Sequence, residues 1–277
     1  MSGQHSPTID VSKRIRQSGR QLRHWFSDRT GTAVAVVIIV AIWEGVTQLY
    51  IQNDAYLPSA SFTVQQSIDN VDLLIDGIIT TFSAVLMAFP IAVILGVIIG
   101  IIFAESFYAR QSSMPILVFS YAIPHAILAP MFLIWFGLGL RGVTAFAIWI
   151  AFFPTFINTL TSMSTVDPEM QKLADITGAT RWQRVRYLKF FKALPDIISG
   201  VRISIQMTIV GVIVAEFLAG GAGLGRLIER ATFTGRLGLT FGAVITIGVG
   251  AIIVFKVITW VLRWIDPSER GDGSMDN

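Results

Sequence analysis

Long uninterrupted apolar runs are the feature that most limits what this chain can fold into. The residues from Ala84 to Ala104 form one run of 21 without a polar side chain, and Ala33–Trp43 is a second, shorter run. A stretch of roughly 18 or more apolar residues is long enough to cross a bilayer as a helix. Only 14% of the residues are charged, where about 25% is usual for soluble globular chains. We therefore predict an all-α integral membrane protein.

Hydropathy over a window of about 19 residues predicts about six transmembrane helices. They form one membrane domain, 31–266, between a polar leader, 1–30, and a short polar tail, 267–277. The third helix is the least regular, because three prolines interrupt it and proline removes a backbone donor. The expected spans are 33–51, 75–104, 113–139, 142–163, 194–219 and 239–262.

Lysine and arginine are unevenly divided between the two ends of these spans. The leader contains six of them, whereas the segment 52–74 between the first two spans contains aspartates and no basic residue. The excess of basic residues on cytoplasmic loops therefore predicts that both termini are cytoplasmic. The loop at about 165–193, between the fourth and fifth spans, lies on the same side. Arg226, Arg230 and Arg236 fall on the other side and weaken this bias without reversing it.

A cationic segment, Lys172–Pro195, breaks the apolar pattern with six basic residues against one acid. Asp167-Pro168 is a typical helix start, and Gly178 is placed to end that helix. Thr180-x-x-Gln183 is a capping-box pattern that predicts a second short helix. We expect two short helices that meet at a glycine corner on the cytoplasmic surface.

Physical chemistry alone leaves two interpretations of this segment. In one, its cations hold two interfacial helices on anionic lipid headgroups. In the other, the segment is a compact docking element that passes the movement of a cytoplasmic partner into the attached transmembrane helices.

The segment "LADITGATRWQRVRYLKFFKALP" resembles the cytoplasmic loop of permease subunits of ATP-binding-cassette (ABC) importers. In the branch that serves sulfonates, taurine and nitrate, this loop reads roughly E-L-A-x-x-L-G-A-S-R-W-x(9)-L-P-x-A-L-P. Three further stretches are similar to the same branch, in the same order: "LPSASFTVQQSI", "IPHAILAPMFLIWFGLG" and "VIVAEFLAGGAGLGRLI". Lys172, Thr177 and Phe190-Phe191 depart from the family pattern.

The resemblance implies a type I ABC importer permease in the bacterial inner membrane. Its expected partners are two ATPase subunits, which carry ATP and Mg, a second permease copy that forms a homodimer, and an extracytoplasmic solute-binding protein. We expect no cofactor on this chain and no nucleic acid partner. The expected cargo is a small organic or anionic solute, such as a sulfonate, taurine, nitrate or a vitamin precursor. The residues that the resemblance assigns to ATPase coupling are Leu173, Ala174, Gly178, Ala179, Arg181, Trp182, Leu194 and Pro195.

Polar residues inside the spans are costly, so each is a functional candidate. Our candidates for the translocation pathway are Tyr121, His125, Asn158 and Gln206. Structural explanations remain for others: Glu216 near a span end can extend toward the headgroups, and Glu44 can be a paired packing residue.

An ion-coupled secondary transporter is the alternative, but such proteins often show repeated halves with paired broken helices, and neither is evident. An enzyme would need clustered acid, base or nucleophile side chains, which the sequence does not offer. The chain has no cysteine and three histidines, so we expect no metal site. Gly137–Gly142 matches a dinucleotide-binding glycine pattern, but it ends a membrane span instead of following a strand. Gly96-x-x-x-Gly100 favours close helix packing.

Overall fold

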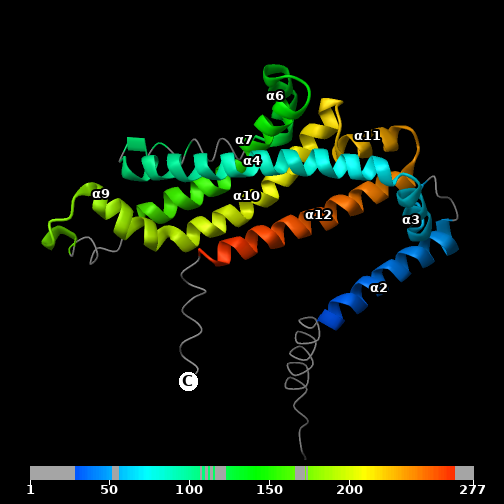
Figure 1. Cartoon of the computed structure of the whole chain (residues 1–277), viewed down its shortest axis with the longest axis horizontal. Helices are drawn as coiled ribbons and strands as arrows, with labels where there is room; N and C mark the ends of the chain where they lie inside the picture. The colour runs from blue at the N-terminus through cyan, green and yellow to red at the C-terminus, as the bar shows by residue number, and fades with distance from the viewer. Residues whose placement is uncertain are drawn as a thin grey trace, which may run out of the picture. The chain divides into compact units, whose positions relative to one another are not determined.

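The computed structural model describes residues 29–51, 56–106, 108–109, 112, 115, 123–165, 172 and 174–265. Within these residues every regular element is a helix (Figure 1). The elements are α2 (Arg29–Val46), η1 (Thr47–Ile51), α3 (Ala60–Asp69), α4 (Val71–Glu105), η2 (His125–Leu128), α6 (Ala129–Phe136), α7 (Leu140–Ser164), α9 (Arg181–Gln183), η3 (Arg184–Lys189), α10 (Phe190–Ala219), α11 (Leu224–Phe233) and α12 (Leu237–Arg263).

Five described helices are long and apolar enough to cross a membrane. They contain most of the first, second, fourth, fifth and sixth predicted spans and confirm the all-α fold class. The third predicted span is described mainly from residue 123 onward, where it forms the short apolar helix His125–Phe136. Much of its first half, with Tyr121, lies outside the described residues. The long helices are Gly31–Leu49, Val71–Glu105, Leu140–Ser164, Arg181–Ala219 and Leu237–Arg263.

The chain divides into two compact units, 1–65 and 66–277. In the first unit, the Glu44 carboxylate accepts hydrogen bonds from the backbone N–H of Ser61 (3.1 Å) and from its hydroxyl (2.6 Å). Ser61 is in the first turn of α3, where unpaired backbone N–H groups favour a negative charge. Glu44 is therefore a paired residue that joins α2 to the start of α3.

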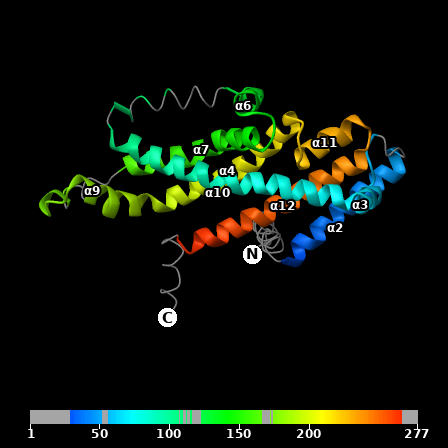
Figure 2. The ribbon, with the colours of Figure 1, turned by 45° about the horizontal axis from the view of Figure 1, so that its top comes forward.

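In the second unit, α4, α7 and α10 run side by side (Figures 1 and 2). Glycines bring them together: a Cβ on Gly96 would lie 2.8 Å from Thr155 Cβ, and one on Gly100 would lie 2.7 Å from Thr159 Cβ. On α10, a Cβ on Gly200 would lie 2.8 Å from Asn158 Cβ. Small residues at such positions let membrane helices approach closely, which confirms the packing role predicted for Gly96 and Gly100.

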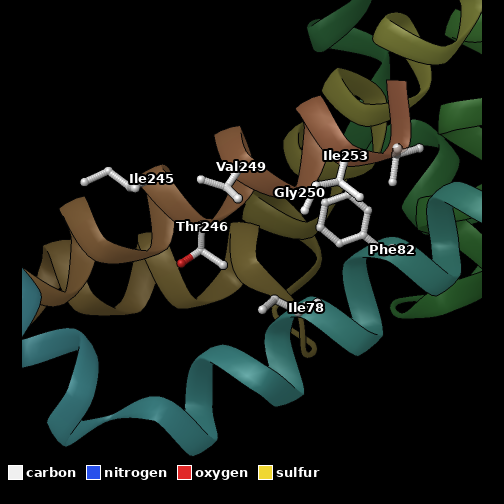
Figure 3. A pocket seen from close by; sticks show the side chains of 8 residues that line it. Ile78, Phe82, Ile245, Thr246, Val249, Gly250 and Ile253 are labelled. Atoms are coloured by element: carbon white, nitrogen blue, oxygen red, sulfur yellow. The ribbon is translucent and has the colours of Figure 1, made fainter. Parts of the chain in front are cut away.

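The outer surface of this unit between α4 and α12 is apolar. A groove of about 420 Å³ between α4 and α12 is lined almost entirely by apolar side chains. Figure 3 shows the ring of Phe82 against Gly250, and a Cβ on Gly250 would lie 2.3 Å from that ring. Ile245, Val249 and Ile253 are about half exposed along the same helix, as expected for side chains that face lipid.

Candidate functional site

The glycine corner predicted at Gly178 is a turn closed by two backbone hydrogen bonds. Gly178 has φ 65°, and its N–H donates to Asp175 O (3.1 Å) while Ala179 N–H donates to Ala174 O (3.0 Å). This pair of bonds is a Schellman motif, which ends a helix on a left-handed residue. Gly178 adopts that conformation at little cost because it has no Cβ. The predicted helix end is confirmed.

The predicted capping box follows directly. The Thr180 hydroxyl accepts from Gln183 N–H (3.3 Å), and the Gln183 side chain accepts from Thr180 N–H (2.8 Å). Arg184 then ties the two sides of the corner together, since its Nε donates to Ala179 O (3.0 Å) and its Nη1 pairs with Asp175 Oδ1. The Schellman motif, the capping box and the contacts of Arg184 together fix the direction in which the chain leaves the corner.

The second helix of this segment is longer than predicted. The sequence predicted a short helix that ends before the fifth span. In the structure this helix runs on into the fifth span as one continuous helix of 39 residues, Arg181–Ala219. No glycine lies between Thr180 and Ser199, and Pro195 is accommodated inside α10. The turns at Arg184–Lys189 are π-helical, with bonds to the fifth residue instead of the fourth. The corner is therefore continuous with a membrane span.

The corner presents large apolar side chains to solvent. Ile176 is 84% exposed, and Trp182 and Tyr187 are about two-thirds exposed. Exposed apolar groups gathered on a polar segment indicate an interaction surface. Among the residues assigned to coupling, Gly178, Arg181 and Trp182 are exposed, Ala179, Leu194 and Pro195 are partly buried, Ala174 is buried, and Leu173 lies outside the described residues.

Two of the predicted pathway residues line one cavity. His125 and Asn158 border a pocket of about 450 Å³ between η2, α7 and α10, with Phe153 and Met207 among its other walls. The His125 ring packs edge-on against Phe153 at 5.8 Å between centroids. The Asn158 amide donates to Pro154 O (2.8 Å). Gln206 is exposed on α10 and is not among the residues that line this pocket.

A second, more polar pocket of about 340 Å³ continues from Asn158 toward the end of the bundle that carries the Gly178 corner. Its α7 residues recur at helical spacing, three to four residues apart, so the stripe was readable in the sequence. Of this stripe the sequence prediction included only Asn158. Hydroxyl side chains in a membrane helix often hydrogen-bond their own backbone, as Ser162 does to Asn158 O (2.6 Å). The lining residues are Asn158, Thr161, Ser162, Thr165, Lys192 and Asp196.

The sequence interpretation of Glu216 was wrong. Its side chain does not extend toward the headgroups, because the residue is only 2% exposed and is held inside the protein. Its Oε2 accepts from the Thr81 hydroxyl (2.8 Å) and from Gly225 N–H (2.9 Å). The Thr81 oxygen in turn accepts from Leu224 N–H (2.8 Å). This network joins α4, α10 and the start of α11, at the opposite end of the bundle from α9 (Figures 1 and 2).

Comparison with known proteins defines the class. The family of inner membrane components of binding-protein-dependent transport systems matches residues 96–271, and the chain belongs to this family. It is therefore a permease subunit of a binding-protein-dependent ABC importer and not the ion-coupled transporter that was the alternative.

The relatives transport different compounds. The riboflavin transport system permease RibX of Chloroflexus aurantiacus is 31% identical over 81% of this chain and 83% of its own length. The formylaminopyrimidine transport permease ThiX of Halalkalibacterium halodurans is 27% identical over 70% of this chain and 78% of its own length. The taurine transport permease TauC of Escherichia coli is 24% identical over 71% of this chain and 74% of its own length.

Proposed function

We propose that this chain lines the membrane pathway of the importer and receives the movement of a separate ATPase through the segment 168–192. The observation that carries the proposal is the rigid corner at Gly178, which exposes Ile176 and Trp182 and continues without a break into α10. A partner that moves this corner therefore acts directly on the end of a transmembrane helix. Lipid attachment alone would not require two interlocking caps and a bridging arginine.

The proposed assembly contains two copies of the permease, two ATPase subunits and an extracytoplasmic solute-binding protein. ATP and Mg belong to the ATPase subunits. The cargo is a small polar organic solute or anion, in keeping with the compounds named for the relatives. The pocket of His125 and Asn158 supports a pathway between α7 and α10, since it places two polar side chains in a mainly apolar cavity.

The orientation of the corner is tested with single cysteines, which is practical because the chain has none. With both termini in the cytoplasm, Asn53→Cys reacts with a membrane-impermeant maleimide added to intact cells, and Ile176→Cys does not. Ile176 is a suitable reporter because it is exposed and its side chain caps neither helix. Labelling of Ile176→Cys from outside would contradict the proposal; labelling after the cells are permeabilised is the control.

The pathway is tested with His125→Ala and Asn158→Ala. Each removes a polar group from the cavity wall, so we expect roughly tenfold slower uptake of the solute carried by the binding protein, as for a loss of about 1.4 kcal/mol. Assembly with the ATPase should be unchanged. Ser199→Ala is the matched control, since Ser199 is an exposed α10 residue whose hydroxyl bonds its own helix. Normal uptake by both pocket variants would show that they only pack.

A further inference from the structure

Glu105, the last residue of α4, binds two cationic side chains from the segment Lys172–Pro195. Arg181 donates through Nη2 to the Glu105 carbonyl oxygen (2.5 Å) and through Nε to its Oε2 (3.5 Å). Lys189 forms an ion pair with the other carboxylate oxygen, Oε1. We call Glu105, Arg181 and Lys189 the Glu105 clasp. It joins positions that are 76 and 84 residues apart in the sequence.

The Glu105–Lys189 pair of the clasp is better shielded from solvent than an ordinary surface ion pair. The side chains of Glu105 and Lys189 are 17% and 20% exposed, so solvent and salt screen them less than exposed charges. Arg181 is 76% exposed, but its main bond is to a helix-terminal carbonyl, one of the last four that an α-helix leaves without a partner. Two cations at the C-terminus of α4 also complement the helix dipole.

The π-helical turns bring both cations to the same carboxylate. Lys189 follows Arg181 by eight positions, which in an ideal α-helix would place the two side chains about 80° apart around the axis. The π turn takes more residues per turn and so reduces this separation. The wide turns Arg184–Lys189 thus lie between the two contact points, and the clasp braces the least regular part of the Arg181–Ala219 helix.

Within the membrane bundle, α4, α7 and α10 pack closely against one another without any help from the clasp. The close approaches at Gly96, Gly100 and Gly200 leave no room for a Cβ without displacement of a neighbour. The corner at Gly178 projects past this bundle, with η3 between them. A push on the corner would either deform the π turns or move the whole bundle, and the contact with α4 decides which occurs.

We propose that the Glu105 clasp stays closed through the transport cycle and transmits the movement of the corner to α4, which makes Glu105 a positioning residue for coupling. This inference rests on the proposed docking of the ATPase to the same segment. Without the clasp, the corner still binds the ATPase, but the π turns absorb its movement. ATP hydrolysis then continues while the membrane helices fail to follow.

The test measures the distance between the two clasped elements in the permease–ATPase complex, reconstituted in nanodiscs. Spin labels are attached to Ile102→Cys on α4 and Arg186→Cys on η3, both exposed, in a chain without other cysteines. Double electron–electron resonance should give one narrow distance within each permease copy that is the same without nucleotide and after trapping with ATP and vanadate; singly labelled chains identify the distances between the two copies. In Glu105→Gln we expect this peak to broaden and to shift on trapping, while the ATPase still co-purifies and hydrolyses ATP.

Glu229→Gln is the matched control, because Glu229 has the same 17% exposure and an ion pair with Arg226, but lies on α11. It should keep the narrow, nucleotide-independent distance. Three outcomes would overturn the proposal: a distance in the native chain that changes on trapping, a Glu105→Gln peak as narrow as the native one, or loss of the ATPase from Glu105→Gln. Failure of the native chain itself to co-purify with the ATPase would instead overturn the proposed docking.

Discussion

Glu216→Ala is expected to lower the melting temperature of the purified permease by roughly 5 °C or more, taking about 2–4 °C per kcal/mol for a chain of this size. The substitution removes the acceptor of the Thr81 hydroxyl and of Gly225 N–H. Both groups are deep in the protein, and a buried polar group left without a partner costs about 1–3 kcal/mol. The truncated side chain also leaves a cavity beside Gly223, whose backbone packs so closely on the carboxylate that an added Cβ would lie 2.3 Å from it.

Thermal unfolding in detergent, followed by size-exclusion chromatography, measures this loss. Glu216→Gln is the matched control, because its amide oxygen can still accept from Thr81 and Gly225 and its volume is nearly the same. Among the described residues, Glu216 Oε1 has no hydrogen-bond partner, so the amide nitrogen can take that place without breaking a bond. An alanine variant as stable as the glutamine variant would show that the network contributes little.

Glu216 also shows where sequence reasoning stops. Its position near the end of a span suggested an approach to the headgroups, because that inference used only the distance along one helix. The partner that changes the outcome, Thr81, is 135 residues away. Local sequence does hold one signal, since the glycines that follow allow the backbone to fold back onto the carboxylate, as Gly225 does.

Features set by neighbouring residues were predicted well. The apolar runs located five membrane helices, and local hydrogen-bonding rules located the helix end at Gly178 and the capping box of Thr180 and Gln183. The continuity of Arg181–Ala219 was missed because a capping box marks where a helix begins and says nothing of where it ends. The clasp at Glu105 was missed because ion pairing across 84 residues depends on tertiary packing.

Gly178→Val is expected to separate the permease from its ATPase, or to uncouple hydrolysis from uptake, while insertion into the membrane remains normal. No atom lies within 4 Å of the added Cβ, so the substitution causes no clash. The effect comes from the backbone: Gly178 has φ 65°, which costs a residue with a side chain roughly 1–2 kcal/mol. A relaxed backbone would break the Schellman bonds and redirect Ile176 relative to Trp182.

Two variants isolate this effect. Gly235 has φ 70° and equally open space, so Gly235→Val imposes the same strain outside the segment Lys172–Pro195. It should retain the ATPase. Gly178→Asn should retain much of the native behaviour, because asparagine adopts the left-handed conformation more readily than valine. If the segment were only a lipid anchor, Gly178→Val would be mild, and loss of the charges of Arg181, Arg184 and Lys189 together would mainly alter membrane contact.

The most direct measurement is co-purification of the ATPase with tagged permease, alongside uptake by the same cells, for the native chain, Gly178→Val and Gly235→Val. A docking role predicts that Gly178→Val alone loses the ATPase, or keeps it and hydrolyses ATP without uptake, at normal levels of permease in the membrane. If Gly178→Val retains both its ATPase and its transport, the segment is not the point at which the ATPase acts on this permease.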